Sequence, residues 1–248
     1  MTTKGKVALY SIGRGNSIGT CGTVTIGDDA TTYAAGVAES PFVYPTPSVA
    51  LSAVTSTDYL GWRICSDGNA YAAAGPLPTG VTAVAMIAYV GSDNGEAAPY
   101  NHGLALALSD AKDGSTCPWK AFSTDAGQTK QTDSNNFASE SGLQYNATHN
   151  SEIDQYPAFE YPAFKAAIAN NGTAAPTGCS SWFLASGFQW QKMIGAAGLS
   201  NLGLQSGSYW SSTESASFDA WFYYFDSGDW YSVSKENDFV RVRACLAF

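Results

Sequence analysis

Few residues in this chain have the types and spacing that catalysis or metal binding requires. The 248 residues include two histidines, His102 and His149, and neither has another histidine or a cysteine nearby in the sequence. A structural, hydrogen-bonded role is the expectation for both, with metal ligation as the minor alternative. No nucleophile elbow, zinc-protease motif or cysteine–histidine couple is present. We therefore expect a protein that is not an enzyme and uses no cofactor and no metal.

The cysteines and one acidic turn lead to the same expectation. The five cysteines are widely spaced, with no CxxC pair, which argues against zinc: Cys21, Cys65, Cys117, Cys179 and Cys245. We expect buried, reduced thiols, with a Cys179–Cys245 disulfide as the alternative. The turn at 92–96 carries two carboxylates but lacks the ligand ladder of a calcium loop, so a solvated turn is expected.

The chemistry that the sequence does offer is that of a binding surface, in residues 208–248. Residues 220–225 read as a strand whose side chains alternate between two faces. Both faces are aromatic: Trp221, Tyr223 and Phe225 on one, Phe222 and Tyr224 on the other. A half-buried antiparallel strand normally has a polar outer face. Either this strand is buried on both sides, or one of its faces recognises a partner.

The residues that follow predict a hairpin and a last strand. A turn at 226–229 returns the chain as a strand at 230–234, and 235–238 form a second polar turn. The last strand is expected over 240–248. Its alternation puts the apolar side chains on one face and Arg241 and Arg243 on the other.

Several motifs carry a family resemblance. YWSSTE at 209–214, the pattern AWxYxFxxGxW at 220–230, then a lysine and the terminal RVRACLAF resemble the variable proteins of diversity-generating retroelements. These have a C-type lectin fold of the formylglycine-generating-enzyme-like subfamily, in Bacteroides and phage. ICSDG, VAMIAYVG and FLASGFQW are similar to earlier stretches of that family, although Ala185 stands where the family usually has proline. The resemblance covers roughly residues 61–248 and not the N-terminal segment.

The resemblance implies a surface of exchangeable residues on a fixed scaffold. In that family a retroelement rewrites adenine-containing codons, which from asparagine can give Phe, Tyr, Ser, Asp, Val or Ala but not Trp or Lys. The implied ligand-binding residues are Phe218, Asp219, Phe222, Tyr224, Asp226, Asp229, Tyr231, Val233, Ser234, Asn237 and Phe239. The implied scaffold residues are Trp210, Trp221, Trp230, Arg241 and Arg243. The structural alternative is that Phe222 and Tyr224 belong to a core under a long loop.

Composition excludes some partners. Charged residues are 13% of the chain, the net charge is −9 and the pI is about 4.5. Nucleic acid is not expected as a partner, because phosphate binding needs clustered lysine and arginine. The N-terminus has no long apolar run, so neither a signal peptide nor membrane insertion is expected.

The elements upstream of the hairpin are those that must position it. An N-terminal β segment, 1–57, is expected to serve oligomerisation or attachment, with strands near 6–13 and 22–27 and a proline-containing linker or edge strand at 40–54. The ligand-binding domain is expected over 58–248. It begins with an aromatic and aliphatic run that ends in a turn at 66–69. A central strand buried on both faces follows at 81–91, and a strand with a small-residue face at 102–110.

The second half of this domain is expected to hold one long loop and two helices. The loop is predicted over 110–151, anchored by Trp119 and Phe122. A helix over 161–170 carries an apolar stripe of Phe164, Ala167 and Ile168, and a short strand follows at 182–184. Ser186 caps the second helix, which ends at Gly195 or Gly198. The predicted fold class is α+β, a C-type lectin fold of mostly antiparallel sheets preceded by a small β segment.

The predicted function is a hypervariable ligand- or receptor-binding protein, specifically a phage tail receptor-binding protein for host recognition. The expected partner is a protein or glycan receptor on a cell surface, and the expected location is the virion or the bacterial cell surface. Trimeric assembly is a further expectation from the resemblance. The alternatives are a bacterial surface adhesin of the same family, a purely structural virion protein, and an oxidative enzyme of the formylglycine-generating type, whose close cysteine pair is missing here.

Overall fold

The structure is a computed structural model that describes residues 24–26, 31–33, 46–122, 125–155 and 161–248. The chain divides into two compact units, Met1–Tyr44 and Pro45–Phe248. In the first unit, strands β1 (Val24–Ile26) and β2 (Thr31–Tyr33) pair antiparallel. β1 lies inside the strand predicted at 22–27, and the strand predicted at 6–13 lies outside the described residues.

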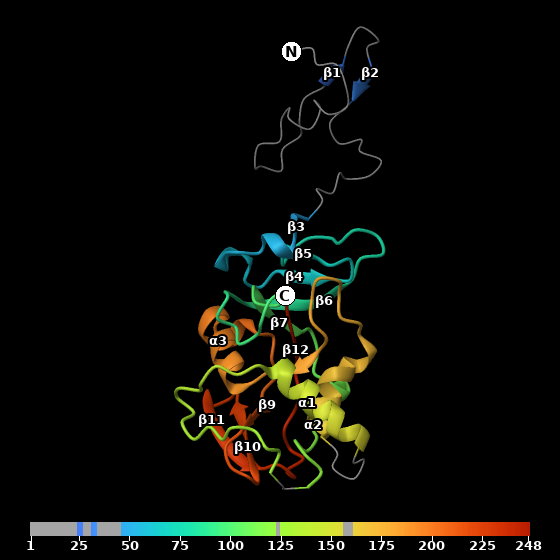
Figure 1. Cartoon of the computed structure of the whole chain (residues 1–248). Helices are drawn as coiled ribbons and strands as arrows, with labels where there is room; N and C mark the ends of the chain where they lie inside the picture. The colour runs from blue at the N-terminus through green and yellow to red at the C-terminus, as the bar shows by residue number, and fades with distance from the viewer. Residues whose placement is uncertain (1–23, 27–30, 34–45, 123–124, 156–160) are drawn as a thin grey trace. The chain divides into compact units, whose positions relative to one another are not determined.

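The second unit is built from two antiparallel sheets and three helices (Figure 1). The larger sheet contains, in spatial order, β3 (Ser48–Ala50), β5 (Asn69–Tyr71), β4 (Arg63–Cys65), β6 (Ala83–Val90), β7 (Gly103–Ala107), β12 (Ala244–Ala247) and β8 (Phe183–Leu184). The smaller sheet contains β11 (Asp229–Ser234), β10 (Asp219–Tyr224) and β9 (Ser208–Glu214). The helices are α1 (Gly142–Gln155), α2 (Pro162–Ala169) and α3 (Gly187–Ala197). Short 3₁₀ turns occupy Leu51–Ala53, Thr57–Tyr59, Lys112–Gly114, Asn170–Gly172 and Leu199–Asn201.

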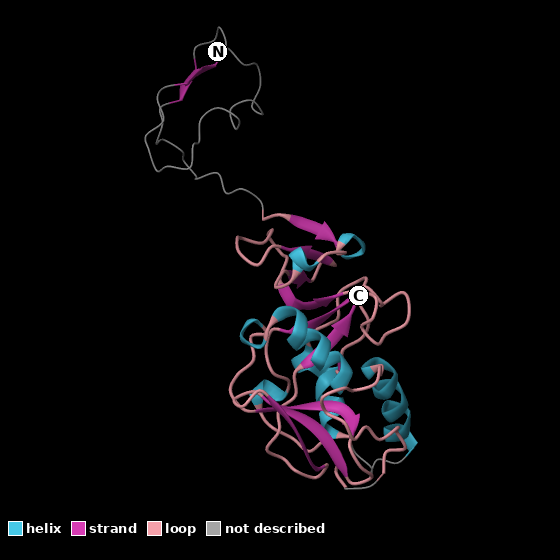
Figure 2. Cartoon of the chain, turned by 90° about the vertical axis from the view of Figure 1, so that its left-hand side faces the viewer, coloured by secondary structure: helices cyan, strands magenta, loops and turns pink. Residues whose placement is uncertain are grey.

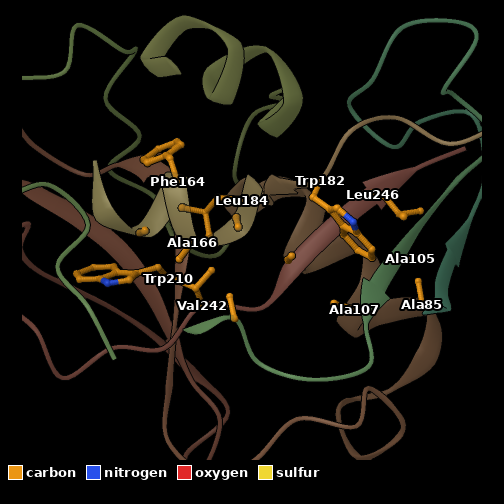
Figure 3. Packing of buried hydrophobic residues seen from close by; sticks show 14 of the residues in the cluster. Ala85, Ala105, Ala107, Phe164, Ala166, Trp182, Leu184, Trp210, Val242 and Leu246 are labelled. Atoms are coloured by element: carbon orange, nitrogen blue, oxygen red, sulfur yellow. The ribbon is translucent and has the colours of Figure 1, made fainter. Parts of the chain in front are cut away.

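Strand β7 shows how the large sheet is sealed on both faces. Its alternating side chains divide between two hydrophobic clusters: Leu104 and Leu106 join one, Ala105 and Ala107 the other. Helix α3 covers the leucine face, and α1 and α2 lie on the other side of β7 and β12 (Figure 1). The small alanines leave room for bulky partners on that side, as Figure 3 shows. The predicted small-residue face is therefore confirmed.

The edges of the sheet follow from local sequence. β3 is an edge strand, as the prolines around it predicted. It pairs with β5, so residues 48–50 belong to the sheet of the second unit and precede the boundary predicted at residue 58. The smaller sheet lies at the end of this unit away from β3, as Figures 1 and 2 both show.

Helix ends agree with the capping signals. Ser186 accepts from the Gln189 backbone N–H, and the Gln189 side chain accepts from the Ser186 N–H, which completes a capping box at α3. This helix ends at Gly198. Pro162 begins α2, as predicted. The predicted apolar stripe of α2 is wrong in one position, because Ile168 is 36% exposed.

The predicted loop over 110–151 is partly wrong. Its last residues form the start of α1, whose polar sequence has no apolar stripe that periodicity could detect. Within α1, Asn146 and His149 are buried and hold the helix through polar contacts. Apart from the 3₁₀ turn at Lys112–Gly114, the described residues of the segment before α1 form no helix or strand. Trp119 is a buried anchor there, as expected, but Phe122 is 51% exposed.

The last strand is shorter than predicted, since only Ala244–Ala247 form β12. Val240 and Val242 are still buried, but their carbonyls accept from Cys117 and Ala111 of the irregular segment. Arg241 makes an isolated bridge to Tyr209 of β9. The chain therefore remains extended over 240–243 without joining β7.

The observed architecture is mixed α+β with mostly antiparallel strands, which confirms the coarse fold class. The helices number three in the described part of the chain, where two were predicted. No helix among the described residues is long and apolar enough to cross a membrane.

Candidate functional site

The predicted hairpin forms, and its register sets out the candidate site. β10 pairs with β11 so that Phe222 lies opposite Tyr231 and Tyr224 lies opposite Asp229. On its other edge β10 pairs with β9, where Phe222 lies opposite Trp210. Because side chains alternate along a strand, these residues share one face of the small sheet.

Aromatic rings pack against one another on this face. The Phe222 ring stacks on Tyr231, with centroids 5.9 Å apart and planes at 25°. It makes edge contacts with Trp210 at 5.9 Å and with Phe239 at 5.8 Å. Tyr231 also meets Tyr224 edge-on at 6.3 Å. We call this surface, made of Phe222, Tyr224, Asp229, Tyr231, Val233 and Phe239, the hairpin face.

The rings of the hairpin face differ in exposure. Phe222 is only 8% exposed and forms its floor. The others reach solvent: Tyr224 is 36% exposed, Tyr231 44% and Phe239 49%. Phe218, which precedes β10, is 61% exposed. These four are the majority of the seven large hydrophobic side chains that are exposed in the described part of the chain. The structural alternative therefore holds for Phe222 and not for Tyr224.

Polar groups border the rings. Asp226, in the turn, accepts a hydrogen bond from Ser206 at 2.9 Å. A hydrogen bond to Asp226 also raises the pKa of the Tyr224 hydroxyl above its ordinary value. Asn237 is less available, since its side chain donates to the Ser234 carbonyl at 3.1 Å. Asp229, the first residue of β11, is exposed.

Two predicted binding residues lie on the opposite face. Asp219 and Ser234 lie opposite each other across the hairpin. Their side chains point to the face of the sheet that carries Trp221, whereas Phe222 points to the other face. Both are half-buried. Because side chains alternate along a strand, these two residues are not part of the hairpin face. The prediction that all eleven residues form one surface is therefore wrong.

Two of the predicted scaffold residues, Trp210 and Arg243, are buried. Trp210 is fully buried and donates its indole N–H to the Cys117 carbonyl at 2.8 Å. Arg243, 2% exposed, donates to the Asp110 carboxylate at 2.7 Å and to the Ala107 carbonyl at 2.8 Å. These contacts join β9 and the chain end to the segment after β7.

The other three scaffold residues are half-buried. Trp221 donates its indole N–H to the Gln131 carbonyl at 2.6 Å. Trp230 packs edge-on against Phe137 at 4.8 Å and Tyr223 at 5.2 Å. Arg241 donates to the Ser206 carbonyl. The irregular segment 125–141 thus supplies partners for the back of the hairpin, which strand periodicity alone could not reveal.

A buried ionic network supports the same sheet. The Glu214 carboxylate, fully buried, pairs with Lys235, also fully buried, and with Lys130 at 3.0 Å. Backbone N–H groups of Ala126 and Gln128 donate to it at 2.8 and 3.1 Å. Lys235 was expected as a fixed residue, but its partner could not be predicted because Glu214 lies 21 residues earlier in the sequence.

Burial and charge shift the pKa values within this network in opposite directions. Burial lowers the pKa of Lys235, against the pull of Glu214. For Lys130 burial works in the same direction, but hydrogen bonds to Asp125 and Glu214 prevail and raise its pKa. Lys130 in turn holds the pKa of Asp125 at about 2.

The histidines and cysteines, which were considered for metal or redox chemistry, can be placed in the structure. His149 is buried, stacks on Tyr161 at 4.3 Å and lies 2.7 Å from the Gln128 amide nitrogen. His102 is exposed. The four described cysteines are free thiols, so the alternative Cys179–Cys245 disulfide is wrong. Nowhere in the described ranges do three or more His, Cys, Asp or Glu side chains gather as metal ligands.

The acidic turn at 92–96 is only partly the solvated turn that was predicted, because Ser92 and Asp93 are exposed but Asn94 and Glu96 are not. Asn94 is fully buried and donates to the Tyr100 and Gly103 carbonyls at 2.9 and 3.1 Å. Glu96 accepts from Ser141 at 2.6 Å and from Gln189 at 2.6 Å. The turn therefore connects β6 to the starts of α1 and α3.

The site defined by these contacts is a sheet surface: an antiparallel hairpin with exposed aromatic rings and exposed carboxylates at its turn. The crystal structure of a fimbrial protein from Bacteroides ovatus ATCC 8483 is similar to this chain, with a TM-score of 0.53 and 14% identity. The likeness covers 76% of this chain and 48% of that protein, so the chain spans about half its length.

At this identity the likeness concerns the fold alone. No protein-family model matches the chain, and no curated protein matches it. The α+β architecture is thus shared with a fimbrial protein, while the C-type lectin fold remains a proposal.

Proposed function

We propose that this chain is a recognition protein that binds a receptor through the hairpin face. The observation that carries the proposal is the cluster of exposed rings, Tyr224, Tyr231 and Phe239, packed around the buried Phe222. Contiguous exposed apolar patches are uncommon on soluble proteins and mark sites of interaction. Tyrosine and phenylalanine also provide contact area at low conformational cost, as in antibody loops.

The support beneath the hairpin face fits this role. Trp210, on the neighbouring strand β9, packs edge-on against Phe222, and the Glu214–Lys235 pair joins β9 to the turn after β11. A surface that is held rigid loses little entropy when it binds. Side chains on its outer side can therefore change without loss of the scaffold.

This division between outer and inner residues favours a diversified binding surface on a C-type lectin scaffold. The outer residues Tyr224, Tyr231 and Phe239 belong to the set that a rewritten asparagine codon can encode. The inner residues Trp210, Glu214 and Lys235 are outside that set. The test is the nucleotide sequence around the gene. An imperfect repeat with adenines at these codons, beside a reverse transcriptase gene, is expected, and its absence would refute diversification without touching the binding proposal.

For location, we propose display at a bacterial cell surface or on a phage tail, with a protein or glycan receptor as partner. Of these two locations, the similarity to a fimbrial protein favours the bacterial cell surface. The proposed assembly is a trimer, because weak sites gain avidity when clustered. Antibody labelling of intact cells, compared with purified virions, separates the two locations.

Binding through the hairpin face is tested with a matched pair of double variants. Tyr231→Ser/Phe239→Ser removes two exposed rings of the hairpin face, whereas Leu108→Ser/Ile168→Ser removes two exposed apolar side chains elsewhere. Both are expected to change the free energy of unfolding by about 1 kcal/mol or less, since exposed side chains add little stability.

The readout is binding of the full chain to arrays of short synthetic peptides and of oligosaccharides. We expect the hairpin variant to lose binding and the control to keep it. Equal loss in both variants, or binding that survives in the hairpin variant, would refute the proposed site.

A further inference from the structure

The exposed charged side chains between residues 215 and 240 are all acidic. Between residues 215 and 240 the exposed charged side chains are Asp226, Asp229, Glu236 and Asp238, and the half-buried Asp219 is acidic too. The one lysine in this stretch, Lys235, is fully buried against Glu214. Just beyond it, Arg241 is half-buried and donates to the Ser206 carbonyl.

Two of these carboxylates belong to residues beside the exposed Tyr224, and a third precedes the exposed Phe239 in the sequence. Asp229 lies directly opposite Tyr224 across the hairpin. Asp226 hydrogen-bonds with Tyr224, and Asp238 is the residue before Phe239. The same surface thus presents aromatic rings and carboxylates side by side.

We infer that the partner of the hairpin face is a protein surface rich in arginine and lysine, an inference that rests on the proposed function. An arginine or lysine head group can lie over a tyrosine or phenylalanine ring and pair with a neighbouring carboxylate at the same time. The alkyl stems of these side chains cover apolar rings as well. The hairpin face offers both kinds of contact within one small area.

The physical alternatives are less favourable. An anionic glycan or nucleic acid would be repelled by the local carboxylates and by the net charge of −9. A neutral sugar can stack on an aromatic ring, but it leaves the carboxylates without opposite charges. A cationic protein surface relieves their mutual repulsion and is attracted over distance, which raises the association rate.

The probes for the test are three sets of synthetic peptides and an array of neutral oligosaccharides. The peptide sets share their aromatic and aliphatic positions and differ only in having Arg/Lys, Ser or Glu at the others. The full chain is compared with Asp229→Asn/Asp238→Asn. The control, Asp58→Asn/Asp113→Asn, makes the same change in net charge at exposed residues outside 208–240.

We expect the Arg/Lys peptides to bind most tightly. Their Kd should rise roughly 2- to 10-fold in the hairpin charge variant, in line with two exposed ion pairs, and stay constant in the control. The association rate should fall as ionic strength rises from about 0.01 to 0.15 M, because the Debye length shrinks from about 30 to 8 Å.

The outcomes separate this inference from the proposed function. If Ser peptides or neutral sugars bind as well as Arg/Lys peptides, and only Tyr231→Ser/Phe239→Ser abolishes binding, the partner inference fails and the binding site stands. If no probe binds, or the aromatic variant binds normally, both fail.

Discussion

The buried carboxylate of Glu214 offers the sharpest test of how the hairpin face is supported. It has no exposed surface, and it faces the ammonium groups of Lys235 and Lys130 and two backbone N–H donors. Glu214→Gln keeps the shape of the side chain but removes its charge. Lys235 then keeps the Ser217 carbonyl, at 2.8 Å, without a buried counter-charge beside it.

The expected cost follows from that uncompensated charge. Removing one partner of a buried ion pair destabilises a protein by about 3–5 kcal/mol, because the other charge stays in a low-dielectric interior. Removing both charges together, in Glu214→Gln/Lys235→Met, should cost much less, since hydrophobic replacement of a buried pair is often close to neutral. The double-mutant cycle should therefore show a coupling energy of about 1–3 kcal/mol.

Urea unfolding followed by tryptophan fluorescence measures these energies. All seven tryptophans lie in the unit 45–248, so fluorescence follows the unfolding of that unit alone. A cost below about 1 kcal/mol for Glu214→Gln, or a double variant as unstable as the sum of the two single variants, would refute the reasoning.

Three further predictions concern the hairpin face, its ionic support and the thiols. Phe222→Ala should cost about 3–5 kcal/mol of unfolding free energy, while Tyr224→Ser should change it by less than about 0.5 kcal/mol, and equal costs would contradict the burial difference. The pKa of Asp125 is lowered from 3.8 to about 2, chiefly by Lys130, so its stabilising effect is present above about pH 4 and lost as pH falls towards 2. In Asp125→Asn the free energy of unfolding should depend less on pH in that window. The difference should be small, because the Asp125 side chain is 52% exposed. Burial raises the pKa of the Cys117 thiol to about 11 and that of Cys179 to about 12, so iodoacetamide at neutral pH should modify both slowly until the chain unfolds, as peptide mass spectrometry can check.

Local patterns were enough to predict the hairpin. The turn at 226–229 and the alternation on either side of it specify two paired strands, and the structure has them within one residue. The Ser186 capping box and the leucine–alanine alternation of β7 are equally local. Each of these signals lies within a few residues of the element it defines.

Features that depend on distant partners could not be predicted. The polar helix α1 is held by Asn146, whose amide groups reach the backbone of Leu184 and Gly142, so its sequence lacks a hydrophobic stripe. The shortened last strand has the same cause, because Val240 and Val242 bond to the irregular segment and not to a strand. Such contacts become visible only when the chain is folded.

Phe222 shows how the two kinds of information combine. Codon logic and alternation place it with the exchangeable residues, but its ring is the floor on which Tyr231 and Phe239 rest. A polar residue at this position would leave a gap beside Trp210 and tilt the outer rings. If the surface is diversified, position 222 should therefore vary only among apolar residues, while positions 224, 231 and 239 vary freely. Sequencing siblings of this gene would show that contrast, and polar residues at position 222 as common as at position 231 would contradict the role of Phe222 as the floor.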